Sequence, residues 1–199
     1  MGGGSNPIRR FPVRGVGRGR QGARQKGAAT VARVFRGEFR QKVDGKGRVS
    51  IPASFRRVLE AQDPDWETGK RPRFVIVYGD ERRAHLECFS ITAMEDVDAR
   101  VARMQRGSPE RRAMETLLYT LSTDAEVDED GRIVLSQKLR DKLGLENEVY
   151  FAGTADTFQI WHPDTYKARE KARLDAVLGA LPEGADEFSL LPELPAQGD

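Results

Sequence analysis

The chain contains an internal repeat, and this repeat constrains its fold more than any other feature of the sequence. Residues 43–51 read VDGKGRVSI, and 84 positions later residues 127–135 read VDEDGRIVL. The alignment runs without a gap from Lys42 beside Glu126 to Arg56 beside Arg140. Because a unit that occurs twice in one chain resembles a fused dimer, we expect each copy to complete the hydrophobic core of the other.

Each copy has the local pattern of a strand, a tight turn, a second strand and a short helix. Residues 35–43 alternate between two faces with a period of two, which predicts a half-buried strand. Asp44 and Gly45 favour a hairpin turn, and Pro52 favours a helix start after a short strand at residues 48–51. In the second copy, Ser136 predicts the start of the equivalent helix and Gly144 its end.

A second pair of strands and a helical segment follow in each copy. We expect these strands at residues 74–78 and 86–89, and again at residues 148–152 and 157–161. The pattern from Thr92 to Glu95 predicts a capping box, Ser108 a further helix start, and Pro163 a helix that ends near residue 178. The predicted fold class is α+β, with two interleaved β-rich units at the centre.

The two ends of the chain differ in composition from the rest. Residues 1–33 contain seven Arg, one Lys and no acidic residue, whereas residues 181–199 contain five acidic residues and no basic one. Neither segment has an apolar period, so neither buries enough surface to offset its ordering entropy, and we expect two disordered tails. The net charge of +2 therefore reflects the head, and overall charge is no argument for nucleic-acid binding by the core.

Cysteine usage and hydropathy exclude several classes of protein. Cys88 is the single cysteine, so the chain forms no intrachain disulfide, which suits a reducing cytosol. Its apolar strand surroundings favour a packing role over a nucleophilic one. The sequence has no apolar run long enough for a membrane span, and its head lacks the apolar segment of a secretory signal.

Several segments resemble the MraZ family. Residues 34–39 (VFRGEF) and 44–52 (DGKGRVSIP) are similar to the start of that family's sequences, and a second Asp-x-x-x-Arg motif and the FQIW strand at residues 158–161 are similar as well. The likeness covers roughly residues 34–180. It implies a bacterial transcriptional regulator of the cytoplasm and nucleoid that assembles into rings and binds the promoter of the cell-division and cell-wall gene cluster.

The resemblance also implies the architecture. We expect tandem AbrB-like swapped-hairpin β units that form a pseudo-dimeric, barrel-like body with peripheral helices. The expected parts are a disordered head (1–33), a first SpoVT-AbrB-like domain (38–91), a helical connector (92–121), a second such domain (122–167), a C-terminal helix (168–180) and an acidic disordered tail (181–199). Since the family's chains begin at the equivalent of Val34, the head is either an added basic arm or the result of a start assigned too early.

Charge distinguishes the two Asp-x-x-x-Arg loops. Basic residues surround the first and are opposed only by Glu38 and Asp44, whereas five acidic residues between positions 124 and 130 surround Arg132 at the second. A phosphate backbone favours the first loop and is repelled by the second. The candidate DNA-binding residues are therefore Lys46, Arg48, Arg36, Arg40 and Lys42.

All the candidates except Lys46 also have a purely structural interpretation. Arg48 is placed to pair with Asp44 across the turn, and the charged residues of the first strand are otherwise a solvated face. If the hairpin enters a major groove, Arg or Lys side chains there bind guanine O6 and N7. A ring whose subunits are related by rotation presents its hairpins in one direction, so we expect direct repeats in the DNA.

Other kinds of site find little support. His85 and His162 lack metal-ligand spacing, and the Gly45-Lys46-Gly47 segment lacks the P-loop pattern, so we expect neither metal nor cofactor. No Ser, Cys or His arrangement supports an enzyme with Asp44 or Asp128 as its base, so we predict that the chain is not an enzyme. The remaining alternative is a protein-binding module of the antitoxin type. The tandem duplication and the helical middle favour the regulator.

Overall fold

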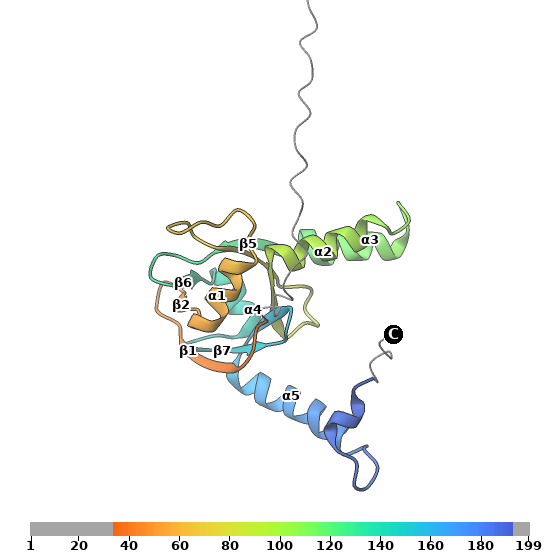
Figure 1. The fold of residues 1–199 in the computed structure, drawn as a ribbon. Helices are drawn as coiled ribbons and strands as arrows, with labels where there is room; N and C mark the ends of the chain where they lie inside the picture. The colour runs from red at the N-terminus through yellow and green to blue at the C-terminus, as the bar shows by residue number, and fades with distance from the viewer. Residues whose placement is uncertain (1–33, 193–199) are drawn as a thin grey trace, which may run out of the picture. The chain divides into compact units, whose positions relative to one another are not determined.

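The computed structural model describes residues 34–192, so the predicted head (1–33) and the last part of the predicted tail (193–199) lie outside the described residues. The fold is α+β, as predicted (Figure 1). Its elements in chain order are β1 (Glu38–Lys42), β2 (Arg48–Ser50), α1 (Ala53–Ala61), β3 (Arg73–Val77), β4 (His85–Ser90), α2 (Ile91–Ala102), α3 (Pro109–Glu115), the π-helix η1 (Thr116–Thr120), β5 (Ser122–Glu126), β6 (Arg132–Val134), α4 (Gln137–Leu143), β7 (Glu148–Gly153), β8 (Thr157–Trp161), α5 (Pro163–Leu178) and the 3₁₀ helix η2 (Glu187–Leu190).

The strands form two antiparallel sheets that mix the two halves of the chain. The larger sheet has six strands in the order β1-β7-β8-β4-β3-β5, and the smaller sheet pairs β2 with β6. The first strand of each half therefore pairs with the other half: β1 lies beside β7, and β5 lies beside β3. If each strand is replaced by its counterpart in the other half (β1 by β5, β3 by β7, β4 by β8, and the reverse), the strand order of the larger sheet is the same, read from the opposite edge. Its edge strands β1 and β5 are not hydrogen-bonded to each other, so the sheet does not close into a barrel.

The residue pairs within the ladders are also preserved when the two halves are exchanged. In the smaller sheet Arg48 pairs with Val134, Val49 with Ile133, and Ser50 with Arg132. Because Arg132 lies 84 positions after Arg48, exchanging the halves maps this ladder onto itself, with Val49 and Ile133 at its centre. In this later part of the repeat the offset is 72, because Ser90 and His162 cap the helices that follow β4 and β8. With that offset the ladder between β4 and β8 has the same property and is centred on Glu87 opposite Gln159.

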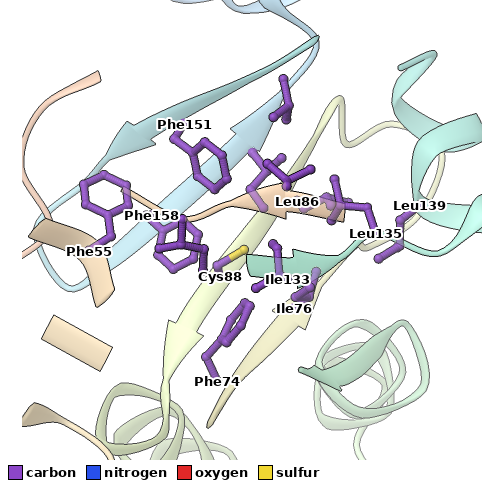
Figure 2. Close-up of a cluster of buried hydrophobic side chains, with 14 of the residues drawn as sticks. Phe55, Phe74, Ile76, Leu86, Cys88, Ile133, Leu135, Leu139, Phe151 and Phe158 are labelled. Atoms are coloured by element: carbon purple, nitrogen blue, oxygen red, sulfur yellow. The ribbon is translucent and has the colours of Figure 1, made fainter. Parts of the chain in front are cut away.

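Both halves contribute to one hydrophobic core. Figure 2 shows side chains from α1, β3, β4, β6, α4, β7 and β8 gathered in a single cluster. Phe55 of α1 is fully buried and makes ring contacts with Phe35, Phe39, Phe151 and Phe158, with centroids 5.3–6.4 Å apart. Two of these four rings belong to the second half of the chain. The short helix α1 therefore joins the halves through its apolar face.

The helices outside this core show where the sequence patterns succeed and fail. The predicted capping box at Thr92 is wrong, because α2 begins at Ile91 and the hydroxyl oxygen of Ser90 accepts a hydrogen bond from the Ala93 amide at 3.2 Å. The hydroxyl of Thr92 donates instead to the carbonyl oxygen of Gln62. Ser108 caps α3 as predicted, and α5 spans Pro163–Leu178, as predicted. Within residues 34–192, no helix is both long and apolar enough to cross a membrane.

Candidate nucleic-acid interface

The loop between β1 and β2 contains the leading candidates, Lys46 and Arg48. The sequence predicts that its two flanking strands pair as a hairpin, but they diverge after the turn. β1 joins β7, β2 joins β6, and a single bridge between Val43 and Val49 connects the two flanks of the turn. Each strand forms its longer ladder with the other half of the chain, so the loop is a turn between two sheets.

The carboxylate of Asp44 organises this turn. Its Oδ1 atom accepts hydrogen bonds from the backbone amides of Lys46 and Arg48, both at 2.9 Å. Its Oδ2 atom accepts a hydrogen bond from Arg48 Nε at 2.7 Å. The backbone hydrogen bond from Arg48, together with that from its side chain, lowers the pKa of Asp44 to about 2. The carboxylate is therefore charged at neutral pH and fixes the backbone on both sides of Gly47.

The two leading candidates differ in how free their charges are. Lys46 is exposed, and its ammonium group has no hydrogen-bond or ion-pair partner among residues 34–192. The Arg48 side chain is 42% exposed and is held by Asp44, so the predicted pairing of these two residues is confirmed. Its two terminal guanidinium nitrogens make no hydrogen bond or ion pair within residues 34–192, so the pairing through Nε leaves the rest of the fork free.

The smaller sheet brings Arg48 together with its counterpart Arg132. Side chains alternate along each strand, so Val49 and Ile133 are buried, whereas Arg48, Ser50, Arg132 and Val134 lie on the opposite face. Arg132 is 40% exposed and lies directly across from Ser50. Sequence reasoning assigned the two arginines to separate loops, because it could not show that their strands pair.

The other three candidates lie on or before β1. Arg36, Arg40 and Lys42 are all exposed, and Arg40 and Lys42 share the outer face of the strand with Glu38. Arg40 is engaged within the chain, because its guanidinium lies 3.6 Å from the carboxylate of Glu148 on β7. Arg40 also borders a groove between β1 and α5 with a volume of about 560 Å³. Arg40 is therefore less free than Lys46 to bind a phosphate.

A further basic residue, Arg140 of α4, lies beside the loop and was not a candidate from the sequence. Gly47 has a φ of +78°, and a Cβ atom on it would overlap Arg140 Nη1 and the carbonyl oxygen of Leu135. Arg140 belongs to the second half of the chain. The one available signal was the repeat alignment, which places Arg140 opposite Arg56.

Comparison with known proteins identifies the family. The chain matches the family model described as "MraZ protein, putative antitoxin-like" over residues 34–116 and 118–177. The chain belongs to the MraZ family. It is 50% identical to the transcriptional regulator MraZ of Ruegeria sp. (strain TM1040) and 52% identical to that of Ruegeria pomeroyi, each over 161 residues, or 81% of this chain and 96% of the relative. It is 50% identical to the one from Cereibacter sphaeroides (strain ATCC 17029) over 170 residues, or 82% of this chain and 98% of the relative.

The second loop of this MraZ family member has the same backbone as the first but different chemistry. The carboxylate of Asp128 accepts from the Arg132 amide at 2.8 Å, as Asp44 does from Arg48. The guanidinium of Arg132, however, pairs with Asp130 at 3.4 Å and not with Asp128. Glu129 pairs at 3.2 Å with Arg71, which lies in the first half of the chain between α1 and β3. The acids at this tip are thus partly neutralised by residues of both halves.

The remaining titratable candidates have structural surroundings. Cys88 is fully buried in β4, and burial raises the pKa of its thiol well above the usual value, in agreement with a packing role. The ring of His85 stacks on Trp161 with centroids 4.3 Å apart and lies 3.0 Å from the Glu87 carboxylate. His162 caps α5 by accepting from the Asp164 amide. Among residues 34–192, no group of three or more His, Cys, Asp or Glu side chains is arranged to hold a metal ion.

Proposed function

We propose that the chain is a sequence-specific DNA-binding transcriptional regulator, and that the β1–β2 loop and the exposed face of the smaller sheet contact duplex DNA. The observation that carries the proposal is the exposed Lys46 at a turn tip, whose ammonium group has no partner among residues 34–192, next to the partly exposed Arg48. A two-stranded β ribbon fits a major groove, where Arg and Lys side chains bind guanine O6 and N7. The names of the relatives, each called a transcriptional regulator, support the same function.

The candidate residues divide into two roles in this proposal. Lys46 and Arg48 are the base-contacting pair, because they lie at or beside the tip. Arg40 and Lys42 on the outer face of β1, and Arg36 just before the strand, contribute contacts to phosphates, which fix orientation without selecting sequence. The pairing of Arg40 with Glu148 makes its contribution the smallest of the three.

We also propose the finer architecture that the family implies. The exchange-symmetric strand order and registers support tandem AbrB-like swapped-hairpin units, at residues 38–91 and 122–167, in a pseudo-dimeric, barrel-like body. The proposed connector, residues 92–121, covers α2 after its first residue together with α3 and η1. The proposed C-terminal helix, residues 168–180, includes the later part of α5, which ends at Leu178. An acidic tail at residues 181–199 follows and includes the exposed η2.

The biological setting belongs to the same proposal. The partner is promoter DNA of the cell-division and cell-wall gene cluster, bound at direct repeats by a ring of copies of the chain in the cytoplasm and nucleoid. A ring related by rotation alone would present every β1–β2 loop in one direction, which is why direct repeats are expected. Footprinting tests this point, since protection of an inverted repeat would contradict the ring. The chain is proposed to have no enzymatic activity.

The test compares Arg48→Ala with Arg132→Ala on the DNA immediately upstream of the chain's own coding sequence and on a scrambled duplex of equal length. We expect the wild-type chain to prefer the upstream duplex and Arg48→Ala to weaken that specific complex by about 10- to 100-fold, the value of one good base contact. Arg132→Ala should have the smaller effect, because its loop is acidic. Equal losses on both duplexes would make Arg48 a phosphate or structural residue instead.

The antitoxin-type alternative has one observation in its favour, the wording of the matching family description. A protein of that type would neutralise a protein partner. Failure of the wild-type chain to shift any upstream duplex in gel electrophoresis, together with recovery of a stoichiometric protein partner, would favour this function over the regulator.

A further inference from the structure

We propose that Arg140, from the second half of the chain, is a positioning residue for the DNA-contacting tip of the first half. This inference rests on the proposed function of the β1–β2 loop. It goes further, because residues of both halves then build the surface that recognises DNA. The distribution of charge alone assigns recognition to the first half.

The contacts around Gly47 place Arg140 in this role. The carbonyl oxygen of Gly47 accepts a hydrogen bond from the Leu135 amide at 2.8 Å. Arg140 Nη1 donates to the carbonyl oxygen of Leu135, and Nη2 donates to Gln137 Oε1. The guanidinium fills the space that a Cβ atom of residue 47 would occupy. Gly47, one residue after Lys46, is therefore held by Leu135 and covered by the Arg140 fork.

The two sides of the tip are fixed by different halves of the chain. Asp44, from the first half, binds the amides of Lys46 and Arg48. Leu135 and Arg140, from the second half, hold Gly47, the residue between Lys46 and Arg48. Base recognition needs the contacting groups in one geometry, whereas phosphate contacts tolerate movement. We call the contacts of Leu135 and Arg140 with Gly47 the clamp. Loss of this clamp should therefore reduce discrimination between DNA sequences more than it reduces affinity for DNA in general.

The repeat supplies a matched control. Arg56 is the counterpart of Arg140, and its Nη1 atom likewise occupies the space that a Cβ atom on Gly131 would take. The Gly131 carbonyl accepts from the Ile51 amide at 2.9 Å, which repeats the Gly47–Leu135 contact. Arg56 lies 3.7 Å from the Glu60 carboxylate, whereas Arg140 has no acidic partner among residues 34–192. The acidic tip, which is not proposed to contact bases, thus has the guanidinium cover and the backbone hydrogen bond. Within the described residues, however, Arg56 donates no hydrogen bond to a carbonyl oxygen as Arg140 does to Leu135.

The experiment measures binding by fluorescence anisotropy over a salt series, with the upstream duplex and the scrambled duplex as probes. We expect Arg140→Gln and Arg140→Lys each to weaken specific binding about tenfold, because a lysine cannot reproduce the guanidinium fork. Scrambled-duplex affinity and the salt slope should stay unchanged. Arg56→Gln should leave both affinities at the wild-type value. In a Lys46→Gln, Arg48→Gln background, Arg140→Gln should add no further loss, because the groups that it positions are gone.

Each other outcome overturns the role. Equal losses on both duplexes with a salt slope smaller by about 0.9 would make Arg140 a phosphate contact. Unchanged specificity in Arg140→Gln and Arg140→Lys, or equal effects of Arg56→Gln, would show that the clamp does not position the tip. A wild-type chain with no preference for the upstream duplex would remove the proposed function and this role together. Circular dichroism checks folding, and if Arg140→Gln does not fold, Arg140→Lys decides.

Discussion

Replacement of Phe55 by alanine should be among the most destabilising single changes in the chain. Its side chain is fully buried in α1 and contacts four phenylalanine rings, two from each half. A buried Phe→Ala change costs about 3–5 kcal/mol through lost transfer free energy and the cavity that remains. Each aromatic pair adds about 0.5–1.5 kcal/mol beyond burial, although these increments are not additive when the rings share one neighbour. We therefore expect a loss of about 4 kcal/mol in the free energy of unfolding.

Two further variants separate burial from residue type. Phe188 in η2 is 69% exposed, so Phe188→Ala should cost no more than about 0.5 kcal/mol. Phe55→Leu installs the residue found at the counterpart position Leu139, which is itself buried. That change keeps most of the apolar volume but loses the ring contacts, so we expect a cost of about 2 kcal/mol.

The assay is urea unfolding followed by far-UV circular dichroism at one fixed protein concentration, with the slope of the transition compared between variants. The reasoning requires the order Phe55→Ala, Phe55→Leu, Phe188→Ala, from largest to smallest loss. A loss below about 1.5 kcal/mol for Phe55→Ala, or one no larger than that of Phe188→Ala, would refute the idea that α1 joins the halves.

Two more predictions concern the β1–β2 loop. Gly47→Ala should lower the free energy of unfolding by about 2 kcal/mol or more in urea titrations, because of the positive φ and the overlap with Arg140, whereas Gly45→Ala, which has open space and no positive φ, should stay within about 0.5 kcal/mol. The carboxylate of Asp44 has a folded-state pKa depressed to about 2, so its stabilisation is present above the unfolded pKa near 3.8 and is lost as the pH falls toward 2. Wild type should therefore melt at a higher temperature than Asp44→Asn at pH 6, and the difference should vanish between about pH 4 and 2; a constant difference would exclude this linkage.

Local patterns predicted the elements well, because each strand and helix is encoded by neighbouring residues. The alternation before Asp44, the Pro163 helix start and the Gly144 helix end all correspond to the structure. Thr92 failed as a cap because Ser90 and Thr92 are both suitable residue types, and the choice depends on where β4 ends. Local sequence cannot distinguish a helix capped by Ser90 from one capped by Thr92.

Contacts between the halves were beyond local reasoning. The repeat indicated that the copies complete each other, but not that β1 pairs with β7 or that β2 pairs with β6. Both pairings join residues about 80–115 positions apart, as in the ladder from Arg48 to Val134 or from Glu38 to Ala152. Arg140 was missed for the same reason, since its position at Gly47 exists only after the halves have folded together.

The ladder between β4 and β8 shows what covalent fusion makes available to this chain. Its central pair is Glu87 opposite Gln159, and the Gln159 amide donates to the Glu87 carboxylate at 3.0 Å. In an assembly of two separate, identical polypeptides, the residue at this place would meet itself, and a glutamate would oppose a glutamate, which is repulsive. A single polypeptide with two unequal halves does not have this constraint. It can place a hydrogen-bond acceptor, Glu87, opposite a donor, Gln159, at the centre of the ladder that relates its two halves.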